Sequence, residues 1–374
     1  MTAVGDRCPF RRHRPAREAW RQAPRSWVLC LAPVIWLLAS ASTALAQHLA
    51  GRVLSARDST PIPSSLVQLR DSAGATVARA ATAVGGAFRL GAPKPGRYRV
   101  AILRIGQHPW LSPVVDLSDG ADKRLTLVPP DDPVVLEAIT VEGRTACRPA
   151  LDDRSLIGSL LSEAEKALTL TKLAMESRAV GYVVFTWERN LTPAFGLVDS
   201  TGHLNIDVAW PIRSAAPESL ARHGFVYEEG PSAERPHGGT TWFGPDAVTL
   251  FSPWFLETHC FRVARGPEAD AVEVAFEPAR GRRGSDIEGK LVIGQRTLEL
   301  RRIEWRYVRL PAWVNLRGAG GELTLQRLSS GVYVPKRWWM RGAVHGITTF
   351  AGSKLRLELV AGWQELGGEI VERR

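Results

Sequence analysis

The sequence predicts a mainly β protein: a seven-stranded antiparallel β-sandwich, then an α+β domain in which a long helix packs against a curved antiparallel sheet. Three observations predict this fold. Short apolar runs separated by Gly, Pro, Asp or Ser fill residues 48–128, a pattern typical of antiparallel sandwiches. One long segment, residues 155–178, has the three- and four-residue apolar spacing of a helix. Strand-like alternation then continues through most of the remaining chain.

The first 46 residues predict a secretory signal peptide that is cleaved after Ala46. Seven arginines precede the apolar run Trp27–Leu38, and Ala44–Ala46 supplies small residues at the cleavage point. An uncleaved membrane anchor is the alternative, but a spanning helix needs about 20 apolar residues. The expected location is therefore the periplasm, the outer membrane or the cell exterior.

The same segment carries half of the chain's net positive charge. The whole chain has a net charge of +10, and the segment contributes its seven arginines against only Asp6 and Glu18. Nucleic-acid binding needs basic residues gathered on one surface. The densest later cluster, residues 280–283, is interrupted by a glycine and is expected to be a solvated loop. No nucleic-acid partner is expected.

The first domain is expected to span residues 47–128. Arg97 and Arg99 alternate with Tyr98 and Val100, as in a sheet with one buried face. The seven strands are expected at residues 48–54, 65–70, 76–81, 87–90, 97–105, 113–117 and 123–128.

The turns of this domain fall in an order that resembles the carboxypeptidase regulatory-like domain, a transthyretin-like fold. They are Gly51–Val53, Thr60–Pro63, Val67–Leu69, Gly85–Leu90, Pro95–Tyr98 and Gly106. The resemblance implies an accessory module that binds carbohydrate or protein and has no catalytic residues. Family members often carry an acidic residue before the Gly-x-Phe turn, where this chain has Ala83 and Val84. Neither a turn-stabilising nor an ion-binding role of that acid is therefore expected here.

Residues 129–150 are expected to link the two domains. Pro129–Pro133 predicts a stiff, extended spacer. The next segment, Val134–Gly143, resembles the short extended segment that follows the same sandwich in TonB-dependent outer-membrane receptors; the alternative is simply another strand. That resemblance implies a protein of a Gram-negative-type cell envelope, with outer-membrane association as one option.

The second domain is expected to span residues 151–374 and to open with the helix at 155–178. Asp152, Asp153 or Ser155 is expected to cap that helix. Strands are expected at residues 182–187, 203–209, 225–228, 247–250, 261–264, 271–277, 287–293, 297–308, 321–327, 333–342 and 354–359. The strand series from Asp286 to Arg341 resembles LolA-like open β-barrels. Those proteins are periplasmic lipoprotein carriers and envelope sensors.

Two cysteines remain once the signal segment, with Cys8 and Cys30, is removed. An even pair in an exported protein predicts a disulfide between Cys147 and Cys260. Two separate buried thiols are the alternative. Two distant cysteines without nearby histidines do not form a zinc signature, so no metal is expected.

Aromatic residues of the second domain are candidates for lining a ligand site. On an open sheet they could hold an acyl chain or stack on a sugar, whereas ordinary core and rim packing is the alternative. The candidates are Trp254, Phe255, Trp305, Trp338 and Trp339.

No catalytic motif stands out, and no cofactor is expected. The chain has no HExxH, no Gly-x-Ser-x-Gly and no phosphate-binding loop. The densest polar group is Glu257, His259 and Cys260, but adjacent residues on a strand point to opposite faces. No catalytic residue is therefore assigned.

The leading hypothesis is an exported, non-catalytic cell-envelope binding or scaffold protein. Its partner would be an envelope glycan, lipid or protein. The alternatives are an envelope hydrolase of the peptidase type, with the sandwich as its accessory domain, and a periplasmic carrier of a hydrophobic ligand. The oligomeric state is left open by the sequence.

Overall fold

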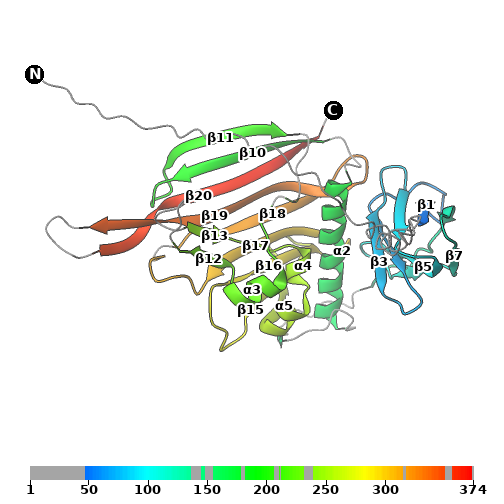
Figure 1. The fold of residues 1–374 in the computed structure, drawn as a ribbon, viewed down its shortest axis with the longest axis horizontal. Helices are drawn as coiled ribbons and strands as arrows, with labels where there is room; N and C mark the ends of the chain where they lie inside the picture. Colours follow the sequence, from blue (N-terminus) through cyan, green and yellow to red (C-terminus); the bar gives the residue numbers. More distant parts are fainter. Residues whose placement is uncertain are drawn as a thin grey trace, which may run out of the picture. The chain divides into compact units, whose positions relative to one another are not determined.

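The computed structural model describes residues 47–135, 145–147, 155–177, 182–205, 210, 212–230, 239–314, 317–349 and 356–372 (Figure 1). The predicted signal peptide, the candidate caps Asp152 and Asp153, and residues 136–144 of the linker lie outside these ranges. The described chain is mainly β, as the sequence predicts. No helix within these ranges is long and apolar enough to cross a membrane.

The first domain is the predicted sandwich, with all seven predicted strands present. One sheet has the order β4-β1-β8, and the other has the order β3-β2-β5-β6, with β7 also paired to β5. Their bounds are β1 (Gln47–Val53), β2 (Leu66–Arg70), β3 (Thr76–Ala81), β4 (Ala87–Ala92), β5 (Gly96–Leu103), β6 (Trp110–Leu111), β7 (Val115–Leu117) and β8 (Asp122–Leu127).

Two details of the sandwich differ from the prediction. The strand β6 is additional; with only two residues it is too short to show an alternation. The strand β8 lies parallel to β1, whereas the other pairs are antiparallel. Leu49 of β1 and Val67 and Val100 of the other sheet are fully buried in one shared core.

Gly86 shows why the turn before β4 needs glycine. Its φ is +70°, and a Cβ there would lie 2.5 Å from the carbonyl oxygen of Val53. Only glycine meets both conditions without strain. Two residues later Phe88 is buried in the sandwich core, as its place in the alternation predicts.

The second domain contains the predicted long helix and one open, ten-stranded sheet whose strand pairs are all antiparallel. The helix is α2 (Leu156–Glu176). The strands, in spatial order, are β11 (Leu197–Asn205), β10 (Tyr182–Leu191), β20 (Arg356–Glu372), β19 (Tyr333–Thr349), β18 (Gly320–Arg327), β17 (Leu300–Val308), β16 (Asp286–Gly294), β15 (Ala271–Pro278), β14 (His259–Arg265) and β9 (Thr145–Cys147).

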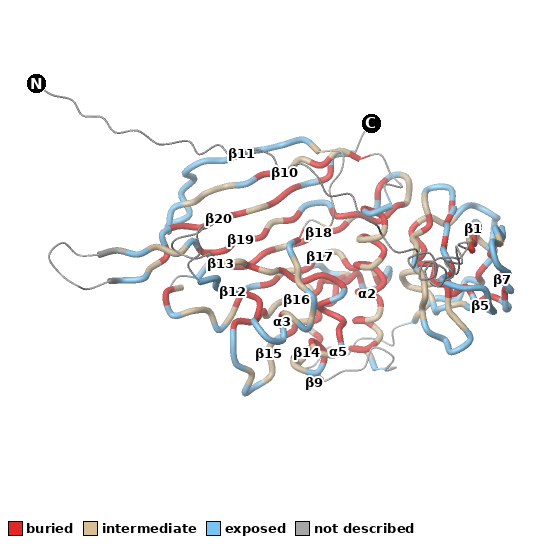
Figure 2. The backbone as a smooth tube through the Cα atoms, in the orientation of Figure 1, coloured by how far each residue is buried: buried red, intermediate tan, exposed pale blue. Residues whose placement is uncertain are grey.

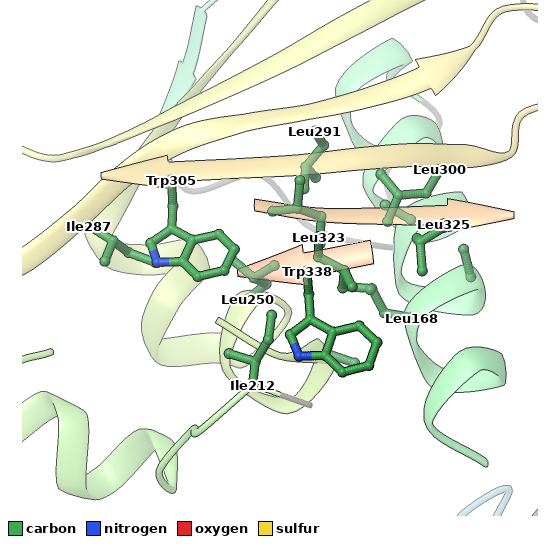
Figure 3. Close-up of a cluster of buried hydrophobic side chains, with 14 of the residues drawn as sticks. Leu168, Ile212, Leu250, Ile287, Leu291, Leu300, Trp305, Leu323, Leu325 and Trp338 are labelled. Atoms are coloured by element: carbon green, nitrogen blue, oxygen red, sulfur yellow. The ribbon is translucent and has the colours of Figure 1, made fainter. Parts of the chain in front are cut away.

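The helix begins where the sequence places it. The Oγ of Ser155 accepts a hydrogen bond from the backbone N–H of Gly158 at 3.1 Å, which satisfies one of the free donors of the first turn. Leu160, Leu161 and Leu168 are fully buried on one side of the helix. They join a single core with the sheet, part of which is drawn in Figure 3.

Smaller elements accompany the sheet, and one of them corrects the prediction. Residues 247–250 form the helical turn α4 instead of a strand. A segment of four residues is too short to show a period, and the Oδ1 of Asp246 caps the turn by accepting from the N–H of Thr249 at 2.8 Å. The other elements are α3 (Pro217–His223), α5 (Pro253–Thr258), β12 (Val226–Glu229) and β13 (Gly239–Trp242); of these only β12 was predicted.

A buried ion pair joins α2 to the turn that follows β5. The Nζ of Lys166 lies 2.5 Å from the Oε1 of Glu163 and donates to the carbonyl oxygen of Gln107 at 3.1 Å. The other carboxylate oxygen of Glu163 accepts from the N–H of Gly106 at 2.8 Å. Burial raises the pKa of Glu163 above its usual value, although Lys166 acts in the opposite direction. The buried carboxylate oxygens of Glu163 and the Nζ of Lys166 thus all have hydrogen-bond partners, as buried polar groups generally do.

Candidate functional site

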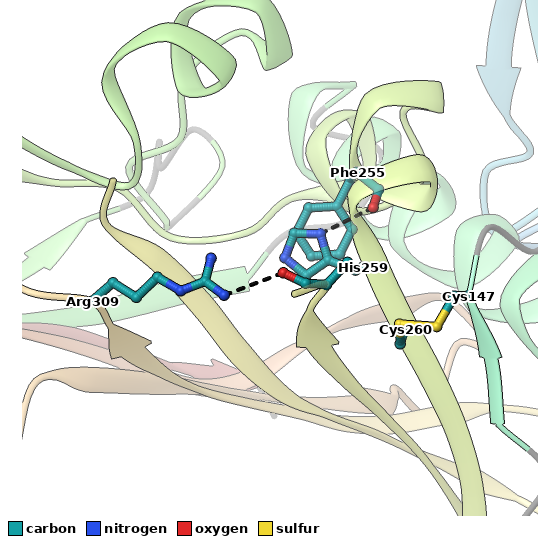
Figure 4. The surroundings of a disulfide bond; sticks show 6 residues. Cys147, Phe255, His259, Cys260 and Arg309 are labelled. Carbon is teal, nitrogen blue, oxygen red and sulfur yellow. Dashed lines mark hydrogen bonds between the residues drawn. A yellow bond between two sulfur atoms is a disulfide. The ribbon is translucent and has the colours of Figure 1, made fainter. Parts of the chain in front are cut away.

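The disulfide predicted from the cysteine pair is present. Cys147 of β9 and Cys260 of β14 are directly opposed in the strand register, with a Cα–Cα distance of 4.0 Å (Figure 4). The two residues are 113 positions apart in the sequence. The bond therefore ties the last strand of the sheet covalently to its neighbour.

His259, next to this disulfide, is enclosed by protein. Its ring stacks on Phe255 with centroids 3.6 Å apart. Nδ1 lies 3.0 Å from the carbonyl oxygen of Phe255, and Nε2 lies 3.3 Å from the Oδ1 of Asp286. Because His259 is fully buried and Cys260 is bonded to Cys147, these residues do not form a Cys–His nucleophile.

Asp286 is the charged member of this buried group. Burial alone would raise the pKa of its carboxyl, but His259 and Arg282 outweigh that effect and hold the pKa below its usual value. The guanidinium of Arg282, which pairs with Asp286, also lies 4.6 Å from the ring of Trp254. The group thus fixes α5 and the start of β16 to each other.

The five candidate aromatics do not meet at one site. Phe255, Trp305 and Trp338 are buried in the core of the second domain, and Figure 3 shows Trp305 and Trp338 among its aliphatic residues. Trp254 is half-buried against Arg282, and Trp339 lies under Arg341, with the guanidinium 5.0 Å from its ring. For three of the five, the structure shows ordinary core packing.

A cleft lies instead at the opposite end of the sheet, between the β12–β13 hairpin and the strands β19 and β20. Its volume is about 640 Å³, within the range of roughly 300–1,000 Å³ usual for ligand sites. Met340, Val344 and Leu366 supply apolar surface. The polar groups that line it are Arg213, Glu228, Glu229, Thr240, His345 and Gln364.

Trp242 holds the hairpin against the sheet. Its Nε1 donates to the carbonyl oxygen of Ala343 at 3.3 Å, and its ring meets Tyr307 edge-on at 4.9 Å. A Cβ at Gly342 would lie 2.3 Å from the Trp242 ring. Glycine at position 342 therefore lets the hairpin approach β19 closely and form one wall of the cleft.

Two of the polar lining residues are held by neighbouring side chains. The Oε1 of Glu228 accepts from the Nε1 of Trp313 at 2.6 Å, and the Trp313 ring lies 4.7 Å from that of His345. Gln364 donates from Nε2 to the Oε1 of Glu188 at 2.6 Å. These contacts orient hydrogen-bonding groups around an apolar floor, an arrangement that can hold and orient a polar ligand.

The other side of the sheet carries a second hollow of about 550 Å³ near β15–β17. Most of its charged side chains are paired with one another. Lys290 contacts Glu273 at 2.9 Å and Glu304 at 3.5 Å, and Arg306 pairs with Glu288. Since these groups satisfy each other, we regard this hollow as a solvated sheet surface.

The cleft was not found from the sequence. Its residues come from three separate segments, near positions 213, 228–242 and 340–366, and none belongs to a recognisable motif. The strand β13, which supplies Trp242, was not predicted. Within the described residues, no group of three or more His, Cys, Asp or Glu side chains is placed to hold a metal ion.

Comparison with known proteins identifies one part of the chain. A search of curated proteins found no match. Among solved structures, the chain is similar to a Bacteroides uniformis protein for which carbohydrate binding has been suggested (6% identity, 87% of this chain and 99% of that chain, TM-score 0.20). It is also similar to the Bacillus anthracis TIE protein (9% identity, 84% and 48%, TM-score 0.20) and to BcpA, the major pilin subunit of Bacillus cereus (8% identity, 86% and 84%, TM-score 0.17).

At these TM-scores the alignments establish no shared fold, and the resemblance of the second domain to LolA-like barrels stays a prediction.

The first domain, in contrast, matches a known family. Residues 48–129 match the family described as carboxypeptidase regulatory-like domain, and the sandwich topology and the Gly86 turn agree with the residues that carried the resemblance. Residues 48–129 are therefore a carboxypeptidase regulatory-like domain.

Proposed function

We propose that this chain is an exported, non-catalytic binding protein of the cell envelope, and that it holds a polar ligand of the glycan type in the cleft between β12–β13 and β19–β20. The observation that carries the proposal is the lining of this cleft. Carboxylate, guanidinium, imidazole and amide groups surround an apolar floor, which matches the alternating hydroxyl groups and apolar ring faces of a sugar. The sandwich would serve as an accessory binding module.

The packing of the second domain favours this function over transport of a lipid. A carrier of an acyl chain needs an apolar cavity along the sheet. Here α2 and the aliphatic residues of β16–β18 fill that space in one continuous core. The remaining cleft is lined by both polar and apolar groups.

Export is supported by the sequence of residues 1–46 and by the disulfide, a bond that persists in oxidising compartments. Mass spectrometry of the envelope fraction should find a chain that begins at Gln47. A chain that keeps Met1 would contradict cleavage.

The binding proposal is tested with a glycan array followed by titration calorimetry on the purified protein. For a glycan that binds, Arg213→Ala and Gln364→Ala should each weaken affinity by about tenfold, because each removes a hydrogen-bonding group from the cleft. Arg280→Ala and Gln295→Ala are matched controls, since both residues are exposed outside the cleft. Equal losses in both pairs, or no glycan bound, would contradict the proposal.

The absence of catalysis is part of the proposal and has its own test. Activity-based probes for serine and cysteine nucleophiles and for metallohydrolases should leave the protein unlabelled. Specific labelling that a competing inhibitor removes would favour the envelope hydrolase instead.

A further inference from the structure

The strand β11 forms an open edge of the ten-stranded sheet. Among the described strands it pairs with β10 alone, and eight of its nine residues are exposed. Leu197 and Val198 are each 62% exposed, and Leu204 is 72% exposed. Figure 2 shows this strand exposed along nearly its whole length. No described strand pairs with its outer backbone N–H and C=O groups, which can therefore bond to a strand of another chain.

The sequence of β11 does little to prevent such pairing. Natural edge strands are usually blocked by Lys, by Pro, by a bulge or by being very short. Residues 197–205 contain no Lys, Arg or Pro. The pairing register between β11 and β10 shifts once, and Val198 therefore has no partner residue in β10. Asp199–Asn205 then pairs with β10 without a further shift. At the opposite edge, the described part of β9 is three residues long and is held to β14 by the disulfide.

We infer that β11 pairs with β11 of a second copy of this chain, antiparallel and about a twofold axis through Thr201. In this register Asp199 lies opposite His203 of the other copy, and Ser200 lies opposite Gly202. Thr201 faces its own equivalent. Twofold symmetry makes each of these pairs occur twice, as in any isologous interface.

Side-chain complementarity selects this register. It places a carboxylate opposite an imidazole, which can share a hydrogen bond, and it brings the apolar Val198 and Leu204 together at both ends. Moving the axis to Gly202 would instead place Leu204 opposite Ser200 and His203 opposite Thr201. Asp199 is already oriented, because its Oδ1 accepts from the Nδ2 of Asn190 at 2.8 Å.

The resulting contact is small, and this sets the conditions of the test. One short strand pair buries less surface than a standard interface, so we expect a dissociation constant in the micromolar range, about 1–100 µM. Dimerisation does not depend on the proposed ligand. It therefore succeeds or fails separately from the binding function.

Cysteine cross-linking tests the position of the axis. The purified full chain carries Thr201→Cys, with Cys8 and Cys30 replaced by Ser so that position 201 holds the one free thiol beside the Cys147–Cys260 bond. Directly opposed residues of antiparallel strands are about 4.5–5.5 Å apart at Cα, within the reach of a disulfide. The native bond already joins such a pair.

Ser200→Cys is the matched control, because its equivalent would be a diagonal neighbour about 7–8 Å away, beyond disulfide reach. Mild oxidation should convert Thr201→Cys into a covalent dimer at least about tenfold faster than Ser200→Cys. Equal rates, or a faster rate at position 200, would overturn the proposed register.

Sedimentation velocity tests the dimer itself. The unmodified chain should shift from monomer to dimer as its concentration rises through the micromolar range. Thr201→Lys should keep it monomeric, because the two lysines would face each other on the axis. Ser72→Lys, in an exposed turn of the sandwich, should leave the dimer unchanged. A chain that stays monomeric at about 500 µM, or a dimer that survives Thr201→Lys, would overturn the inference.

Discussion

The two ends of the ten-stranded sheet are built differently. At the β9 end a disulfide fixes the last strand, and His259 and Asp286 are fully buried next to it. At the β11 end the last strand is almost wholly exposed, and the strands β20 and β19, separated from it by β10, line the cleft. From this difference we expect the β9 end to contribute more to stability, whereas the proposed binding site lies toward the β11 end.

The position of helix α2 explains how one sheet can have both a solid core and an open cleft. It contacts the strands β14–β17 and β19, so its buried face completes the core over that part of the sheet. The β12–β13 hairpin covers β19 less closely, with Trp242 as its main anchor. The first part is packed solid, whereas the second keeps a cleft.

Removing the disulfide should have the largest effect on stability. Replacing Cys147 and Cys260 by Ser should lower the free energy of unfolding by about 4 kcal/mol, because the bond closes a loop of more than a hundred residues in the unfolded chain. Urea unfolding without reductant measures the change. A loss below about 1 kcal/mol would mean that the β9 end does not depend on the bond.

Breaking the buried ion pair on α2 should have the second-largest effect on the free energy of unfolding. Lys166→Met should cost about 3 to 4 kcal/mol, because it leaves the carboxylate of Glu163 buried without its cation. The control is the double variant Glu163→Gln with Lys166→Met, which removes both charges and should recover part of the loss. A double variant no more stable than the single one would contradict this account.

The cost of Lys166→Met should also depend on pH. The pKa of Glu163 is already raised by burial, and loss of Lys166 raises it further. A raised folded-state pKa favours the protonated carboxyl in the folded protein, so its stabilising contribution is present at low pH and is lost as pH rises through that pKa. The deficit should therefore be smaller at about pH 5 than at about pH 8. Urea unfolding at both values checks this, and the double variant should show no such difference.

Truncations of apolar residues should separate the packed core from the cleft directly. Leu323→Ala, in the packed core of Figure 3, should cost about 3 kcal/mol, since the cavity it leaves is closed on all sides. Val344→Ala, on the floor of the cleft and 41% exposed, should cost less than about 1 kcal/mol. Similar losses in thermal or urea unfolding would remove the distinction.

The smallest effect on stability is expected at the open edge. Thr201→Lys should change the free energy of unfolding of the monomer by less than about 0.5 kcal/mol, because the side chain is exposed and lies in no ion pair or buried contact that the structure describes. Urea unfolding at a concentration well below dimerisation measures this. A larger loss would mean that Thr201 stabilises the monomer itself.

The sequence predicted the parts of the fold that depend on local pattern. The sandwich turns around Gly86, the cap at Ser155 and the Cys147–Cys260 bond could each be recognised from residue type and spacing. Segment 247–250 could not, because a run of four residues fits a strand and a helical turn equally well. The start of β11 at Leu197 was missed as well. Asp199, Ser200 and Gly202 are poor strand formers, and this segment is a strand because it pairs with β10.

The candidate site was harder to predict from the sequence than the fold, because its residues come together only in the tertiary structure. Gly342 and Trp242 help to form the cleft only because β13 lies against β19. The two residues are a hundred positions apart in the sequence, so no local pattern connects them. The adjacent aromatic residues Trp254–Phe255 and Trp338–Trp339 were candidates for lining a ligand site because of their residue type alone. In each pair, however, one ring is fully or almost fully buried in the core. A count of aromatic residues does not distinguish a core from a binding surface.

Hydrogen–deuterium exchange on the dilute protein, with and without a bound glycan, tests the difference between the two ends most directly. The account predicts slow exchange in β15–β17 under both conditions, fast exchange in β11, and ligand-induced slowing confined to β12–β13 and β19–β20. Slow exchange in β11 at high dilution, or slowing by the ligand in β15–β17 instead of at the cleft, would contradict it.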